Sequence, residues 1–254
     1  MGIDKQDIAS RFRRSTESYE ANATVQKQIV QHLAELLVVY VPQASRTLEI
    51  GCGTGLLSEK IGRIWRDNHL YINDLVGEMC DKTLSRCHLP ATRVIRGDIE
   101  QVVLSETFDL IVSASTFQWL ANPLATFAKL AAQLLPGGWL VFSTFGKDNF
   151  KELRSVTGQG LEYRSVAELQ TLLPSELEVV YSEETCQVLT FKDPLEILRH
   201  VKKTGVNATD TNVVWTRGRM QTFAETYKMR FQQGGTCPLT YHPIYMVCRK
   251  KERL

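Results

Sequence analysis

The chain has 254 residues, a length that suits one large domain or a core with an elaborated cap. Its hydrophobic content of 43% can fill a sizeable core. The formal net charge is only +2, so nothing marks the whole molecule as a nucleic-acid binder, although a basic patch can still be local.

The six cysteines do not form a metal-binding pattern. They are scattered, with no Cys-x-x-Cys pair and no histidine cluster at metal-ligand spacing, so we expect no metal site. The start of the chain lacks the apolar stretch of a secretory signal, and no later run is long and apolar enough to span a bilayer. We therefore expect a cytoplasmic protein with reduced thiols and no membrane partner.

The chain is predicted to begin with helices, from about residue 5 to residue 37. Pro42 then ends the second helix. In the segment "TVQKQIVQHLAELLVVYV" the apolar residues recur at helical spacing on one stripe: Val25, Ile29, Leu33, Leu36 and Leu37.

Short apolar strands then alternate with helical segments. The predicted order is "TLEIGCG", helix 56–65, "HLYINDL", helix 77–87, "TRVIRGDI", "FDLIVSAS", helix 123–135, a turn at 136–138 and "GGWLVFSTFG". This alternation predicts an open α/β sheet of parallel strands, which binds its ligand in a crevice at the carboxyl ends of the strands.

The pattern changes after Gly146. We expect short helices at 150–156 and 166–173, one long strand "LEVVYSEETCQVLTF", helices at 194–204 and about 213–233, and a last strand "TYHPIYMVCRK". A connection of roughly 45 residues between two strands predicts a cap over the crevice. The expected layout is a single domain over 1–254: a helical lid (1–45), a core (46–146), helices with the sixth strand (147–191), a helical cap (192–238) and the last strand (239–254).

The stretch "LEIGCGTG" holds a glycine loop that does not fit a dinucleotide. Gly51 and Gly53 match Gly-x-Gly-x-x-Gly, but Leu56 takes the third position and the extra glycine is Gly55. A pyrophosphate would be repelled by Glu49, two residues before the loop. The loop therefore favours a cationic ligand without phosphate there, and S-adenosylmethionine fits because it combines a nucleoside with a sulfonium and an ammonium.

Carboxylates follow two further strands. Asp74 lies where an acid commonly accepts ribose hydroxyls, and Asp98 with Ile99 could hold the edge and face of an adenine. Taken singly, Asp74 could be a helix cap and Asp98 an ordinary turn residue. Their order and spacing after the glycine loop favour the ligand-binding interpretation.

These motifs, with "NDL...EM", "GDIE", "FDLIVSASTFQWL" and "LLPGGWLVFSTFG", resemble the class I S-adenosylmethionine-dependent methyltransferases over residues 47–146. The resemblance implies a Rossmann-like, seven-stranded, mostly parallel sheet whose last strand is antiparallel. It also implies that the cofactor is held by Glu49, Gly51, Cys52, Gly53, Gly55, Asp74, Leu75, Met79, Gly97, Asp98, Ile99 and Ser113.

The methyl acceptor is suggested by the ends of the chain. "SASTFQWLANP" has no paired prolines, which disfavours a nucleic-acid amine. "RFRRSTESYEANATVQ", "STFGKDNFKELR", "LRHVKKTGVNAT" and "PLTYHPIYMV" resemble the malonyl-[acyl-carrier protein] O-methyltransferases of biotin synthesis, which esterify the free carboxylate of a malonyl thioester. This resemblance implies acyl-carrier protein, or coenzyme A, as the carrier. The alternatives are a methyltransferase for another small acid or small molecule, and a non-catalytic cofactor-binding module.

A malonyl carboxylate is ionised at neutral pH, so no general base is required and the enzyme's task is alignment in a dry, aromatic pocket. Gln118 and Trp119 could orient the carboxylate, or "FQW" could only pack the following helix. Tyr19 and Gln26 share a helical face and could close over the cofactor, or the helix could only dock on the sheet. The candidate aromatic walls are Tyr19, Phe117, Trp119, Phe145 and Tyr241.

Cations gather in "PLEILRHVKKTG". Arg199, His200, Lys202 and Lys203 could meet an acidic carrier protein or the phosphate of its pantetheine arm. Equally, they could only complement the helix dipole at a helix end. We expect His242 to be structural, or a wall of the acyl pocket, and not a base.

Overall fold

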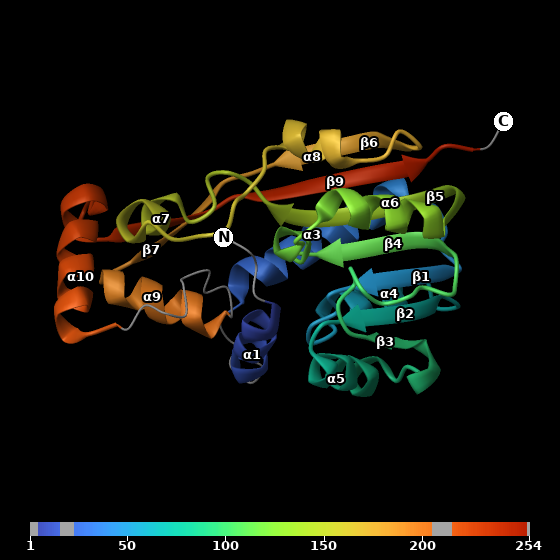
Figure 1. Cartoon of the computed structure of the whole chain (residues 1–254), viewed down its shortest axis with the longest axis horizontal. Helices are drawn as coiled ribbons and strands as arrows, with labels where there is room; N and C mark the ends of the chain where they lie inside the picture. Colours follow the sequence, from blue (N-terminus) through green and yellow to red (C-terminus); the bar gives the residue numbers. More distant parts are fainter. Residues whose placement is uncertain (1–4, 16–22, 205–214, 253–254) are drawn as a thin grey trace.

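The structure is a computed structural model of the whole chain and describes residues 5–15, 23–204 and 215–252. A seven-stranded sheet forms its centre, in the order β3-β2-β1-β4-β5-β9-β6 (Figure 1). The strands are β1 (Arg46–Ile50), β2 (His69–Asp74), β3 (Val94–Arg96), β4 (Phe108–Ala114), β5 (Leu134–Phe145), β6 (Leu177–Glu184) and β9 (Pro243–Lys250).

The strand directions confirm the predicted fold class. β1, β2, β3, β4 and β5 pair in parallel, whereas β9 runs antiparallel to both of its neighbours, β5 and β6. The carboxyl ends of β1 to β4 therefore meet at one edge of the sheet, and the loops that follow them meet there too.

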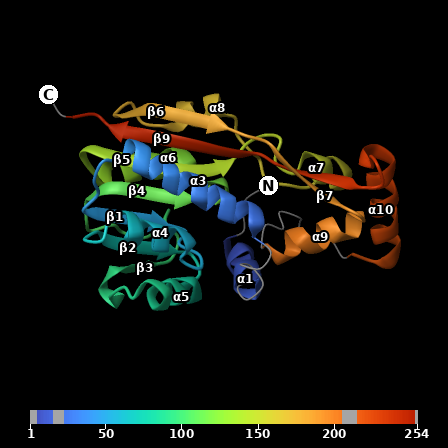
Figure 2. The same ribbon diagram turned by 180° about the vertical axis from the view of Figure 1, so that it is seen from behind.

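Helices cover both faces of the sheet, and each face has its own hydrophobic core (Figures 1 and 2). One face carries α3 (Thr24–Tyr40), α4 (Leu56–Ile64) and α5 (Gly77–Cys87); the other carries α6 (Pro123–Gln133) and α8 (Val166–Leu172). The predicted apolar stripe of α3 is buried, which explains how this helix docks. Among the described residues, no helix is long and apolar enough to cross a membrane.

The two long strands predicted in the last third of the chain are each divided in the structure. β7 (Gln187–Phe191) leaves the sheet after β6 and pairs with β8 (Cys237–Tyr241), which precedes β9, in a separate two-stranded sheet. The break between β8 and β9 has a local cause: Pro243 has no N–H to donate, and the N–H of His242 donates to Asn149 Oδ1 at 3.2 Å. The predicted turn at 136–138 also differs, because it lies within β5.

The ribbon of β7 and β8 projects beyond the central sheet and carries α7 (Lys151–Thr157), α9 (Pro194–Lys203) and α10 (Arg217–Phe231), on the left of Figure 1. Short 3-10 turns occur at Ala91–Arg93 (η1) and Phe117–Trp119 (η2). The cap predicted over 192–238 thus forms helices, but none of its described residues lines the pocket at the carboxyl ends of β1, β2 and β4, which is described below. Helix α1 (Lys5–Ser15) lines that pocket instead.

Candidate functional site

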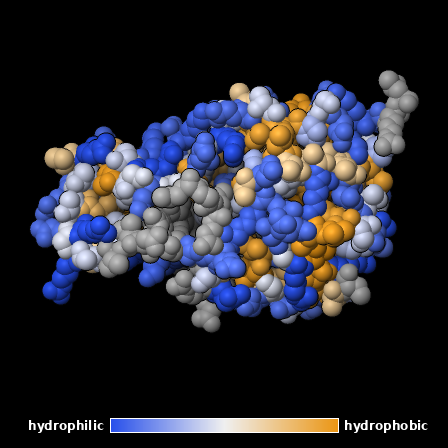
Figure 3. Space-filling view, viewed as in Figure 1, coloured by the Kyte–Doolittle hydropathy of each residue, from blue (hydrophilic) through white to orange (hydrophobic). Residues whose placement is uncertain are grey.

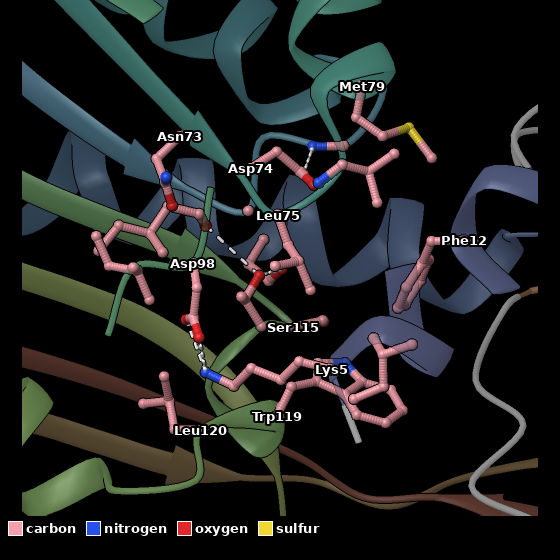
Figure 4. A pocket seen from close by; sticks show the side chains of 18 residues that line it. Lys5, Phe12, Asn73, Asp74, Leu75, Met79, Asp98, Ser115, Trp119 and Leu120 are labelled. Carbon is pink, nitrogen blue, oxygen red and sulfur yellow. Dashed lines mark hydrogen bonds and ion pairs between the residues drawn. The ribbon is translucent and has the colours of Figure 1, made fainter. Parts of the chain in front are cut away.

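A pocket lies at the carboxyl ends of β1, β2 and β4 (Figure 4). Helix α1, the glycine loop, the β2 end, the "GDI" turn and the loop after β4 all contribute to it. The lining residues are Lys5, Ile8, Phe12, Ile50, Gly51, Gly53, Asn73, Asp74, Leu75, Val76, Met79, Asp98, Ile99, Ala114, Ser115, Thr116, Trp119 and Leu120.

The glycine loop leaves room for a ligand close to its backbone. Gly51 has φ +71°, and an added Cβ would lie 2.0 Å from Thr116 Oγ1, so only glycine fits there. Gly53 also has positive φ, but a Cβ at this position would meet no protein atom within 4 Å. Because Gly53 lines the pocket, that open space is where a bound molecule would touch the loop.

Asp74 fixes the glycine loop to the end of β2. Its Oδ2 accepts the N–H of Gly53 at 2.9 Å, and its Oδ1 accepts the N–H of Val76 at 2.8 Å. Burial raises the pKa of Asp74, although both N–H bonds act in the opposite direction. Each oxygen keeps a further lone pair, so the ionised carboxyl group can accept two hydroxyl protons from a ligand.

An apolar surface and a second carboxylate lie beside Asp74. Leu75, Met79 and Ile99 line the pocket and could pack against a flat ring. Both oxygens of Asp98, predicted to hold an adenine edge, accept hydrogen bonds from Lys5 Nζ at 2.7 and 2.6 Å (Figure 4). In this structure an ammonium group of α1 therefore takes the place predicted for an adenine amino group.

Glu49, central to the prediction of a cationic ligand, does not line the pocket. It lies on the α4 face of β1, is 1% exposed, and accepts a hydrogen bond from Ser58 Oγ. Burial raises its pKa to about 8, and the nearby charge of Asp74 adds to this shift. Glu49 is therefore a buried acid behind the loop, and largely protonated at neutral pH.

The loop after β4 separates the predicted "FQW" residues. Trp119 lines the pocket, and its ring meets the ring of Phe12 edge-on, with centroids 5.9 Å apart. Gln118 points away from the pocket, where its amide donates to Ser115 O and accepts from Thr144 Oγ1 at 3.4 Å. For Gln118 the packing alternative thus describes this structure better than the predicted contact with a carboxylate.

Several other predicted residues also lie outside the pocket wall. Phe117 packs into the core against Phe142, with centroids 5.0 Å apart. Ser113 is fully buried and donates to Ile50 O at 2.9 Å, because its position in β4 turns it toward a core. The Cys52 side chain is also buried in a core and contacts Cys80.

Two predicted glycines have backbone roles beside the pocket. Gly55 precedes α4 in a left-handed conformation, with φ +85°. Gly97, with φ +119°, accepts a hydrogen bond at its carbonyl from Asn73 Nδ2 at 2.9 Å. Neither glycine lines the pocket, because each shapes the backbone that brings other residues there.

The pair predicted to close over the cofactor is only partly described. Tyr19 lies outside the described residues. Gln26 is 5% exposed, and neither of its amide atoms has a hydrogen-bond partner among the described residues. Gln26 is not part of the pocket wall, so its contact with the cofactor stays a prediction.

The predicted acyl-side aromatics form a buried cluster near α9. Tyr241 is fully buried, its ring centroid lies 6.3 Å from that of Phe145, and its hydroxyl hydrogen-bonds His200 Nε2 at 2.8 Å. Burial, with the charge of Lys203, lowers the pKa of His200. His200 therefore faces the protein interior, unlike the exposed Arg199 on the same helix.

His242 has a structural position. Its Nδ1 accepts the Asp148 N–H at 3.0 Å, so its Nε2 carries the proton and faces Glu184 Oε2 at 3.2 Å. Among the described residues, Asp148, Cys186 and His242 bring possible metal-ligand atoms within 4.8 Å of one another. In this tautomer, however, both nitrogens of His242 are engaged and neither offers a lone pair to a metal.

Ten of the eighteen residues that line the pocket are not predicted from the sequence. In the loop after β4, Ala114, Ser115 and Thr116 line the pocket beside the predicted Ser113. Ser115 has φ +54°, an uncommon conformation for a residue other than glycine, and its N–H donates to Ser143. Four more missed residues lie inside the quoted motifs but were given no role there: Phe12, Ile50, Asn73 and Leu120. No motif covers the remaining three: Lys5, Ile8 and Val76.

The fold and the pocket define a class of protein. A family model described as "Methyltransferase domain" matches residues 48–142. The fold is similar to that of the YcgJ protein from Bacillus subtilis (TM-score 0.61, 14% identity, covering 88% of this chain and 100% of that chain). It is also similar to N-methyltransferase NodS from Bradyrhizobium japonicum in complex with S-adenosyl-L-homocysteine (TM-score 0.51, 16% identity, 92% and 99%). The fold is that of the class I methyltransferases.

Relatives narrow this class to one family. The chain is 37% identical to a malonyl-[acyl-carrier protein] O-methyltransferase from Bacteroides thetaiotaomicron, over 98% of this chain and 100% of that protein. It is 38% identical to the protein of the same name from Acinetobacter baylyi, over 98% of each. The chain belongs to the malonyl-[acyl-carrier protein] O-methyltransferase family.

Proposed function

We propose that this protein transfers a methyl group from S-adenosylmethionine to the free carboxylate of malonyl-[acyl-carrier protein]. The product is the malonyl methyl ester that primes the pimeloyl chain of biotin. The full-length similarity to malonyl-[acyl-carrier protein] O-methyltransferases is the observation that carries the proposal. The pocket supports the proposal in three ways. A ligand can come close to the backbone of the glycine loop, the Asp74 carboxylate can accept two ribose hydroxyls, and an apolar surface can pack against the adenine.

The pocket residues fit the cofactor. In the proposed arrangement Asp74 accepts the ribose hydroxyls, and the backbone at Gly51 and Gly53 lies along the methionine part. Met79 and Ile99 pack against the adenine, and Asp98 accepts its amino group once Lys5 yields that carboxylate. When bound, S-adenosylmethionine supplies an electrophilic methyl group on a sulfonium.

The protein's own contribution to the reaction is alignment and exclusion of water. The malonyl carboxylate is already ionised at neutral pH, so no residue has to remove a proton. Methyl transfer cancels the charge of an anion against that of a cation, which an apolar environment favours. Phe12 and Trp119, which meet over the pocket, are placed to exclude water there.

We place the carrier protein at α9. Arg199, Lys202 and Lys203 are exposed on this helix. The neighbouring end of the molecule, formed by α10, mixes hydrophilic and apolar residues at its surface (Figure 3). These cations suit an acidic carrier or the phosphate of its pantetheine arm. His200 is not part of this surface, since its ring bonds Tyr241 inside the protein.

Mass spectrometry of malonyl-carrier protein incubated with this protein and S-adenosylmethionine tests the proposal. We expect one added methyl group on the malonyl unit. Parallel reactions with malonyl-coenzyme A and with free small acids such as aconitate identify the accepted carrier. Methylation of a free acid with the malonyl thioesters untouched would make the acceptor wrong, and cofactor binding without any turnover would indicate a non-catalytic module.

A further inference from the structure

The carboxylate of Glu100 joins three walls of the pocket, although the proposed chemistry does not use it. Glu100 directly follows Ile99, which lines the pocket, and its side chain is 8% exposed. A buried carboxylate is costly unless each oxygen is paired, so its partners show what it holds in place.

The partners come from two other walls. Oε2 accepts the N–H of Ala121 at 2.9 Å, and Oε1 accepts the N–H of Asn122 at 2.6 Å. These N–H groups directly follow Trp119 and Leu120 of the pocket wall. Oε2 also forms an ion pair with Lys5 Nζ of α1.

An ionised carboxylate suits this junction better than any neutral group. Burial alone would raise the pKa of Glu100, but hydrogen bonds from Lys5 and from the Ala121 and Asn122 N–H groups outweigh burial and lower it. The two N–H groups point at different oxygens, and only a carboxylate offers two acceptors.

We propose that Glu100 is a positioning residue that sets the acceptor-side turn (residues 117–122) against helix α1. When α1 covers the cofactor, this link holds Trp119 in place against the acceptor. The contact between the rings of Phe12 and Trp119 shows that helix and turn meet over the pocket. The inference rests on the proposed function, because a displacement of about 1 Å at the acceptor can cost on the order of 100-fold in rate.

The variant Glu100→Gln tests this role, since its amide NH2 would face one of the two N–H donors. We expect kcat/KM for the malonyl thioester to fall by about 10- to 100-fold, while the Kd for S-adenosylmethionine stays within about 3-fold. Glu106→Gln is the matched control: it makes the same substitution at a carboxylate that pairs with Arg46 at 3.0 Å and does not line the pocket. We expect this control to keep kcat/KM within about 3-fold.

Wild-type acceptor kinetics in a folded, cofactor-binding Glu100→Gln variant would overturn the inference, as would an equal loss in Glu106→Gln. If Glu100→Gln does not fold, Lys5→Met breaks the link between α1 and Glu100, together with the Lys5–Asp98 pair, and leaves both backbone bonds of Glu100 in place. This variant should raise the acceptor KM by about 5-fold at saturating cofactor, with Lys5→Arg restoring it, and an unchanged KM overturns the inference.

The proposed function and this inference can fail separately. If the wild-type protein does not methylate malonyl thioesters, the proposed function fails, and cofactor dissociation then tests the link. In stopped-flow measurements, the effects of Lys5→Met and Glu100→Gln on the dissociation rate should be non-additive in the double variant, and additive effects overturn the link.

Discussion

Replacing Asp74 by Asn should weaken cofactor binding strongly with little change in shape. The Asp74 carboxylate accepts the Gly53 N–H at 2.9 Å and the Val76 N–H at 2.8 Å, and it lines the pocket. Asn has only one acceptor oxygen, so one of these N–H groups would face an NH2 group. The unsatisfied donor is present with and without cofactor and lowers the stability of both forms, whereas the loss of one charge-assisted bond to a ribose hydroxyl weakens binding by about 1 to 3 kcal/mol, or roughly 5- to 150-fold in Kd.

Isothermal titration with S-adenosylmethionine or S-adenosyl-L-homocysteine measures this change. Asp81→Asn is the matched control, because Asp81 is a surface residue of α5 that does not line the pocket. Its Oδ1 pairs with Arg96 Nη2 at a distance of 2.5 Å. We expect its Kd to stay within about 2-fold of wild type. If Asp74→Asn binds as tightly as this control, Asp74 does not hold the ribose.

Three further predictions concern charge and closure. Because folding raises the pKa of Glu49 to about 8, its contribution to stability is complete below its unfolded pKa and is lost as pH rises through 8. The unfolding free energy without cofactor should fall by a few kcal/mol between about pH 5 and 8, and a pH-independent difference from Glu49→Gln in urea would contradict this. Phe12→Ala removes an aromatic contact of α1, so stopped-flow should give faster cofactor dissociation by about 5-fold; an unchanged rate means that α1 does not retain the cofactor. Reversing the charges of Arg199, Lys202 and Lys203 should reduce turnover of the carrier-protein thioester by about 10-fold at low salt, but not that of the coenzyme A thioester; equal losses on both would exclude this surface.

The sequence located the strand ends well but often missed the direction of side chains. Asp74 and Asp98 line the pocket as predicted, because the carboxyl ends of parallel strands meet at one edge whatever the rest of the chain does. Glu49 and Ser113 do not, because successive residues of a strand face opposite sides, and packing of the helices decided which side became core. A motif fixes the spacing of residues but not the face that each residue occupies.

The sequence by itself determined the elements, the parallel sheet and the position of the glycine loop, because periodicity and glycine spacing are local properties. Only the tertiary structure decided that α1 covers the pocket, that α9 and α10 stand on a projecting ribbon, and that Glu100 joins three walls. These features depend on contacts between residues far apart in the chain, such as Lys5 with Asp98 and Glu100. A long-range contact leaves no periodic signal in the sequence, because its two partners lie in different elements and are brought together only by packing.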